Sequence, residues 1–62
     1  MFGVEWLRGM SIVGRTRSEF KSIKAVLASA RQRAREMPTR PDQIRITDPD
    51  GVVVGTYPIE PD

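Results

Sequence analysis

The chain has 62 residues, carries ten Lys and Arg against eight Asp and Glu for a net charge of +2, and contains neither Cys nor His. This length allows one small domain, residues 1–62, whose core contributes no more than about 3–5 kcal/mol to the stability of the fold. The lack of Cys and His excludes disulfides, the common zinc sites and an imidazole general base. We therefore predict a protein that is not an enzyme and has no metal or cofactor.

Residues 2–16 are predicted to form a β-hairpin. Apolar side chains alternate along its first half, and although helical spacing also fits part of the segment, three glycines favour strands because each costs about 1 kcal/mol inside a helix. The alternating residues are Phe2, Val4 and Trp6. A three-residue loop, Arg8–Met10, places Trp6 opposite Ile12 and keeps the apolar residues on one side, whereas a two-residue loop mixes them with charged ones. We predict the three-residue loop.

Trp6 is the single tryptophan. In the predicted register it faces the helix and is buried there. On the other side of the sheet it would instead anchor a partner, since tryptophan is enriched at binding surfaces. Burial is the predicted outcome.

An amphipathic helix is predicted to follow. Its apolar stripe consists of Phe20, Ile23, Leu27, Ala30, Ala34 and Met37, with Val26 at the flank. The helix begins either after the capping box Thr16–Glu19 or at an N-cap Ser22, and Pro38 ends it by about Met37. Leu27 lies at the centre of the stripe, so we predict that Leu27→Ala leaves the protein largely unfolded.

Residues 44–57 are predicted to form a second hairpin. Asp48, Pro49 and Gly51 occupy the positions that these residues prefer in a type I turn followed by a glycine bulge. With residues 49–51 as the loop, Ile46 opposes Val54 on the core side of the sheet. Strands, one helix and strands predict a two-layer ββαββ fold of the α+β class, with the helix on one face of an antiparallel sheet.

Several segments together resemble a known kind of domain. They are the aromatic-bearing hairpin, Phe20-x-Ser22 before an alanine-rich helix, and the turn-containing run Ile44–Val53. This order resembles small bacterial domains of unknown function with ββαββ organisation, and the likeness covers nearly the whole chain. Such families have no assigned activity, so the resemblance implies a fold and supplies no functional residues.

Asp48 and Asp50 beside Gly51 resemble the start of a calcium loop. An EF-hand loop needs a bidentate glutamate at its twelfth position, and Ile59 stands there in this chain. Turn chemistry accounts for both aspartates, so no metal site is predicted.

A row of basic residues follows one flank of the predicted helix. It comprises Lys21, Lys24, Arg31 and Arg35. Such a row is able to follow the phosphates of a nucleic acid, while long cationic side chains also shield the margins of an apolar stripe and keep a small protein soluble. Nucleic-acid binding through this flank is the alternative function.

The leading expectation is a small interaction module in the cytoplasm. Its partner is another protein or a second copy of the chain in a homodimer, because the uncovered face of the sheet is expected to carry Val53 and Val13 and little else. No segment reaches the roughly 18 apolar residues of a membrane span. No membrane partner is therefore expected. Glu5 and Arg8 interrupt an N-terminus that lacks a signal peptide's basic start, which favours the cytoplasm.

Overall fold

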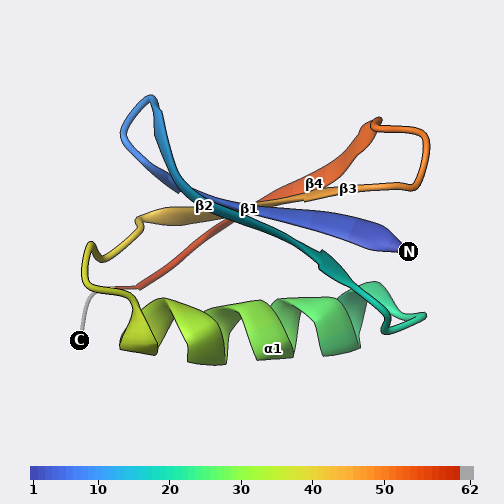
Figure 1. Cartoon of the computed structure of the whole chain (residues 1–62), viewed down its shortest axis with the longest axis horizontal. Coiled ribbons are helices and arrows are strands. Elements are labelled where there is room, and N and C mark those ends of the chain that lie inside the picture. The colour runs from blue at the N-terminus through green and yellow to red at the C-terminus, as the bar shows by residue number, and fades with distance from the viewer. Residues whose placement is uncertain (61–62) are drawn as a thin grey trace.

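The computed structural model describes residues 1–60 and confirms the ββαββ fold of the α+β class (Figure 1). Its elements are β1 (Phe2–Arg8), β2 (Ser11–Ser18), α1 (Ile23–Glu36), β3 (Gln43–Thr47) and β4 (Val53–Pro58). The strands form one antiparallel sheet in the order β2-β1-β3-β4. The pairing of β1 with β3 joins the two hairpins, and α1 lies across one face of the sheet.

The first hairpin turns through two residues, Gly9 and Met10. Arg8 pairs directly with Ser11, so the predicted three-residue loop is wrong. Gly9 has a φ of 62°, and a two-residue hairpin turn requires a positive φ at its first central position. The glycine therefore permits a shorter turn than the apolar pattern indicated.

A β-bulge at Val13 shifts the register beyond this turn. Leu7 opposes Ile12, but Trp6 opposes Gly14, so Val13 is an extra residue on β2. The predicted pairing of Trp6 with Ile12 is wrong, although Trp6 faces the helix as predicted. Gly14 leaves room for the indole, because a Cβ at this position would lie 3.2 Å from the Trp6 ring.

The turn of the second hairpin is the predicted one. The Asp48 carbonyl accepts from the Gly51 amide at 3.0 Å, the Asp48 amide donates to the Val52 carbonyl at 2.8 Å, and Gly51 has a φ of 87°. The Asp48 side chain adds to the turn, since its Oδ1 accepts from the amides of Asp50 and Val52, both at 2.9 Å. Asp48 thus builds the turn with its backbone and its carboxylate.

A second bulge, at Val54, changes the pairing of β3 with β4. Ile46 opposes Gly55 and not Val54 as predicted. Val54 was expected on the core side of the sheet, but it is 41% exposed and does not contribute to the core. Gly55 fits where it does because the Tyr57 ring lies over it, and a Cβ on Gly55 would collide with that ring.

The helix begins after Ser22, the second of the two predicted start points. The Ser22 Oγ accepts from the Ala25 amide at 3.1 Å, as an N-cap does, whereas Thr16 lies within β2 and does not cap the helix. The helix ends at Glu36 with Met37 as C-cap, in agreement with the sequence. Within residues 1–60 no helix has the length and apolar character needed to cross a membrane.

The core lies between α1 and the sheet. Its buried residues are Val4, Trp6, Ile44, Ile46, Val26, Ala30 and Ala34. The helix face that contacts the sheet is centred on Ala30, because Trp6 Nε1 donates to the Ala30 carbonyl at 3.0 Å and a small residue is needed there. Val26 is 1% exposed while Leu27 is only partly buried, and Phe20 is 51% exposed. The predicted central role of Leu27 and the predicted packing of Phe20 are therefore wrong, whereas the predicted burial of Trp6 is confirmed.

Candidate functional site

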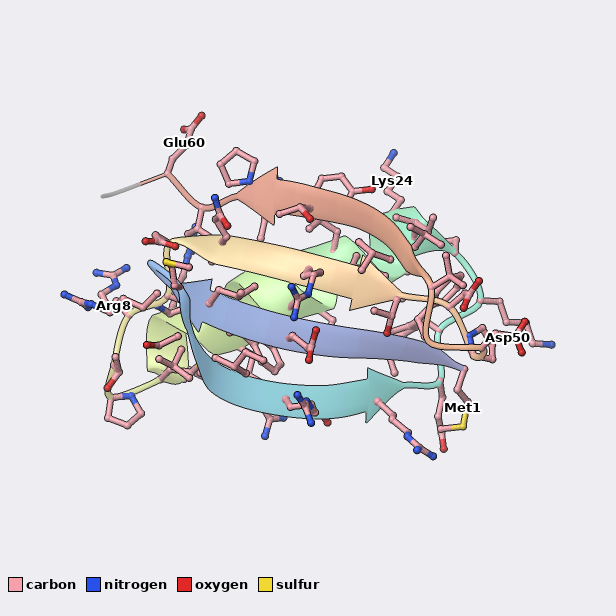
Figure 2. The ribbon with its side chains drawn as sticks, turned by 90° about the horizontal axis from the view of Figure 1, so that it is seen from above. Met1, Arg8, Lys24, Asp50 and Glu60 are labelled. Atoms are coloured by element: carbon pink, nitrogen blue, oxygen red, sulfur yellow. The ribbon has the colours of Figure 1, made fainter. Side chains whose placement is uncertain are left out.

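The face of the sheet opposite α1 carries a row of charged side chains. Glu5 on β1 pairs in register with Arg15 on β2 and with Arg45 on β3, so the three side chains lie side by side on neighbouring strands. Figure 2 views the sheet from the side opposite α1. Val53 lies at this face as predicted. The rest of the prediction is wrong, since Val13 packs against the core and charged side chains occupy the face. We call this uncovered, charged surface the open face.

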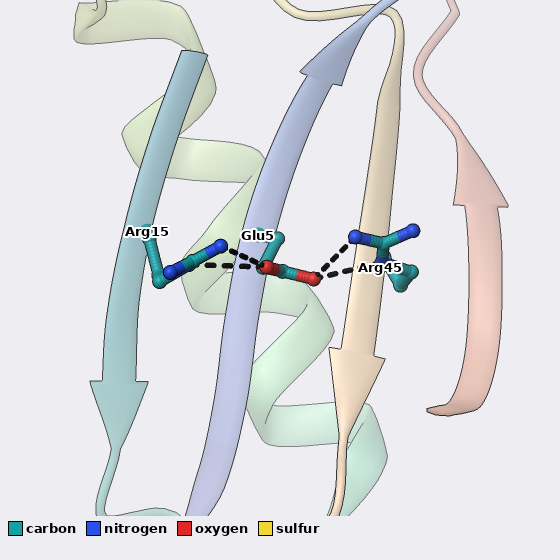
Figure 3. Close-up of polar contacts among 3 residues, drawn as sticks. All are labelled: Glu5, Arg15 and Arg45. Atoms are coloured by element: carbon teal, nitrogen blue, oxygen red, sulfur yellow. Dashed lines mark hydrogen bonds and ion pairs between the residues drawn. The ribbon is translucent and has the colours of Figure 1, made fainter. Parts of the chain in front are cut away.

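Glu5 binds both arginines at once (Figure 3). Its Oε2 accepts from Arg15 Nε at 3.1 Å and lies 2.9 Å from Arg15 Nη2. Its Oε1 accepts from Arg45 Nε at 2.7 Å and lies 2.7 Å from Arg45 Nη2. Each carboxylate oxygen is thus occupied by one guanidinium through its Nε and Nη2 groups, which leaves the Nη1 donors of both arginines out of the contact with Glu5.

The arginines keep Glu5 ionised. The hydrogen bond from Arg45 lowers the pKa of the Glu5 carboxyl, partial burial opposes this effect, and the charge of Arg45 and the contact with Arg15 lower the pKa further. The Glu5 side chain is only 13% exposed, compared with 68% for Arg15. Glu5 is therefore a fixed negative charge that orients two cations at the surface.

Beside this row the open face is hollowed. Gly3 lies two residues before Glu5 and pairs with Arg17 on β2 and with Thr47 on β3. Gly3 has no side chain, and a Cβ there would collide with Thr47 Oγ1. The resulting open hollow of about 580 Å³ extends from the ion-paired row to Val53.

Positive charge is in excess on the open face. Arg17 is exposed, and no acidic side chain among residues 1–60 pairs with it. Glu5 already binds two arginines, so it does not compensate Arg17. The open face consequently attracts groups that carry negative charge.

The structure divides the four basic residues predicted on the helix flank. Lys21 precedes the N-cap and is outside the helix, while Lys24 lies in its first turn and projects on the β4 side in Figure 2. Arg31 and Arg35 line a separate hollow of about 400 Å³ together with Arg40. Arg35 also lies in the last turn of α1, where a cation is favoured by the helix dipole.

No metal-binding geometry occurs at the aspartates of the second turn. The Asp48 carboxylate accepts two backbone amides. Among the described residues, no group of three or more His, Cys, Asp or Glu side chains is close enough to hold an ion. The structure thus gives Asp48 the role in the turn that its sequence position indicates.

The ion-paired row is the feature that sequence reasoning missed. Glu5, Arg15 and Arg45 all occupy strand positions that point away from the helix. Alternation alone would have placed Glu5 and Arg45 on the open face. The contact of Glu5 with Arg15 depends on the bulge in β2, and its contact with Arg45 depends on the pairing of β1 with β3. Neither feature was predicted.

Comparison with known proteins gives no further information on this site. No family model, no curated protein and no solved structure significantly matches the chain.

Proposed function

We propose that this chain is a small non-catalytic interaction module of the bacterial cytoplasm, which binds an acidic partner protein through the open face. One observation carries the proposal: α1 covers one face of the sheet, and the other face presents Arg15, Arg17 and Arg45 against one acid of the described residues, Glu5. Antiparallel sheets tolerate a solvated face, but the charge on this one is uneven. An uneven charge favours partners of the opposite sign.

The state of Glu5 supports a binding role rather than a catalytic one. A general base works best with a pKa near the operating pH. The pKa of Glu5 is lowered, and both of its oxygens are bound by arginines. Glu5 is thus suited to position charges and unsuited to accept a proton near neutral pH.

Affinity capture with matched variants tests the proposal. Tagged wild-type protein, Arg17→Glu and Arg33→Glu are each incubated with native lysate, and the bound proteins are identified by mass spectrometry. Arg17 lies on the open face, whereas Arg33 is an exposed residue of α1. Both variants replace Arg by Glu and therefore change the net charge equally. We expect Arg17→Glu alone to lose the partner. Equal capture by all three proteins would contradict a contact at the open face.

Self-association is part of the proposal. Val52, Val53 and Val54 are 60%, 49% and 41% exposed along one edge of the sheet, and a second copy would cover them. Sedimentation velocity over a wide range of micromolar concentrations measures the mass. A monomeric mass throughout that range would remove self-association and leave binding to another protein unaffected.

Nucleic-acid binding through the helix flank is the second candidate. It is favoured by the position of Arg31 and Arg35, which line one hollow together with Arg40. Labelled DNA and RNA are titrated at about 50 mM and 200 mM salt, because phosphate contacts lose affinity steeply between these concentrations. Binding that weakens with salt and is lost on replacing Arg31 and Arg35 by Glu would support this candidate. Absence of binding at the lower salt concentration would exclude it.

A further inference from the structure

The two edges of the sheet are β2 and β4. Seen from above the open face, no other strand or helix of residues 1–60 covers the outer side of β2 (Figure 2). An edge strand presents backbone N–H and C=O groups that are able to pair with another strand.

The backbone pattern shows which residues of β2 face outward. The two-residue turn is closed by Arg8 and Ser11, which form a hydrogen-bonded pair in such hairpins. Hydrogen-bonded pairs recur at every second residue of an antiparallel ladder, and beyond the bulge this pattern places Thr16 toward β1. Arg15 and Arg17 therefore direct their amides and carbonyls away from the sheet.

The other edge is less suited to accept a strand. The Ile59 amide donates to the Asp42 carbonyl at 2.8 Å, and the same alternation then directs Thr56 and Pro58 outward from β4. Proline has no N–H to donate. Of the two outward residues of β4 only Thr56 therefore offers an amide donor, whereas both Arg15 and Arg17 offer one on β2. The bulge at Val54 further disrupts β4 as a template.

The side chains of β2 favour negative charge on a strand that pairs with this edge. Across the middle of the sheet the charges alternate, from Arg45 to Glu5 to Arg15. An acidic residue on a fifth strand, placed beside Arg15, would continue this alternation. Opposite charges on neighbouring strands stabilise their pairing.

The spacing of the cations fits an extended peptide. Arg15 and Arg17 are two residues apart on one strand, so they stand about 7 Å apart on the same face. Side chains at alternate positions of an extended peptide repeat at the same interval. Two acidic residues separated by one other residue are therefore able to meet both arginines at once.

From these observations we propose that the outer edge of β2 is a strand-addition site for an extended segment of a partner protein with Asp or Glu at alternate positions. Main-chain hydrogen bonds to Arg15 and Arg17 supply affinity, and the two guanidiniums select the acidic residues. This inference rests on the proposed function and names the kind of partner that the open face binds.

A second copy of the chain does not fit this edge. Antiparallel pairing of β2 with β2 of another copy sets cationic strands against each other, which disfavours it. The β4 strand, Val53–Pro58, has no acidic residue to meet Arg15 or Arg17. Charged side chains on an edge strand also discourage pairing with apolar strands, so the edge discriminates in favour of acidic segments.

Nucleic acid is a poorer fit to the same surface. Single strands bind through bases stacked on exposed aromatic rings. Trp6 is buried, and Phe2 and Tyr57 pack against the core under the sheet. The exposed Phe20 lies beside α1, in a hollow lined by helix residues, and not on the open face. The open face thus offers cations without a platform for the bases.

Two fluorescently labelled peptides of equal composition test the proposal. One carries glutamates at alternate positions between threonines and valines, and the other carries the same glutamates in one block. Fluorescence anisotropy at physiological salt measures their affinity for wild-type protein, Arg17→Glu and Arg33→Glu. We expect the alternating peptide to bind more tightly than the block peptide, to lose about tenfold with Arg17→Glu, and to be unaffected by Arg33→Glu.

Amide hydrogen exchange measured by NMR locates the contact. Bound alternating peptide is expected to slow exchange at the Arg15 and Arg17 amides and to leave the Thr56 amide unchanged. Equal affinity for the two peptides, or no protection on β2, would overturn strand addition. If strand addition fails while the Arg17→Glu protein still loses its lysate partner, the interaction module stands without this mode of binding. A single-stranded oligonucleotide that protects the same amides and binds more tightly than the peptide would assign the edge to nucleic acid instead.

Discussion

The two faces of the sheet are built from alternate residues of the same strands, yet they have opposite chemistry. On β3, Ile44 and Ile46 are fully buried against α1, while Arg45 between them is ion-paired on the open face. On β1 the same contrast separates Val4 from Glu5. The difference follows from which face the single helix covers.

This comparison separates stability from recognition. Burial of a large apolar side chain contributes about 1.5–3 kcal/mol, whereas an ion pair at a surface contributes about 0–1 kcal/mol. Changes on the covered face should therefore affect folding. Changes on the open face should leave the fold intact and affect binding.

The largest expected effect is that of Ile46→Ala. Ile46 is fully buried, and truncation of such a residue costs about 2–5 kcal/mol, which is close to the stability expected of a core of this size. The variant should be largely unfolded at 25 °C. Its neighbour Arg45→Ala, on the other face, should keep a cooperative transition. Thermal melts followed by circular dichroism compare the two, and similar melting of both variants would invalidate the division between the faces.

Trp6→Phe is expected to have the next largest effect. The substitution removes the hydrogen bond from the indole to the Ala30 carbonyl and leaves a gap against Gly14. Loss of the bond costs about 0.5–1.5 kcal/mol, and the gap adds to this cost. Urea denaturation measures the change, and an unchanged midpoint would mean that this bond does not hold the helix to the sheet.

Leu27→Ala should cost less than truncation of a core residue. Leu27 is partly buried at the margin of the helix face, so we expect a loss of about 1–2 kcal/mol and a protein that remains folded. Ala28→Ser, on the exposed side of the helix, should change little. Circular dichroism melts of both variants are the measurement. Complete unfolding of the Leu27 variant would restore the helix orientation that the sequence predicted.

Glu5→Gln should have the smallest effect on folding, and that effect should depend on pH. The folded-state pKa of Glu5 is lowered by its arginines. Its contribution to stability is therefore present above the usual glutamate pKa of about 4.3 and is lost as the pH falls through the folded-state value. Wild type should be more stable than the variant near pH 7, by less than about 1 kcal/mol, and the difference should vanish in acid. A difference that is constant with pH would show that Glu5 acts through shape and not charge.

Local signals in the sequence were sufficient for much of the fold. The aspartate and glycine of the second turn, Ser22 as one of two caps, and Pro38 after the helix each act on neighbouring residues. Such local chemistry is readable without knowledge of the rest of the chain. The order of the elements and the buried side of β1 could therefore be predicted.

The register of both hairpins could not be predicted because each contains a bulge, and in the first hairpin the loop is also one residue shorter than predicted. The extra residues, Val13 and Val54, are each followed by a glycine over which an aromatic ring lies, Gly14 under Trp6 and Gly55 under Tyr57. The alternation of apolar and polar residues does not reveal such an extra residue. Its position depends on how an aromatic ring packs, on the opposite strand for Trp6 and on the same strand for Tyr57. The charged row was missed for the same reason, since it depends on pairing between distant segments.

The indole of Trp6 also makes the molecule its own optical probe. As the single tryptophan, 2% exposed and bonded to the backbone of α1, it is the sole source of tryptophan emission, and its spectrum should shift to longer wavelength when the sheet and helix separate and water reaches the ring. Far-ultraviolet dichroism reports the backbone of the same helix. Coincidence of the two signals during denaturation would establish a single cooperative transition. Ligands on the open face act on the far side of the sheet, so their titrations should leave this emission steady.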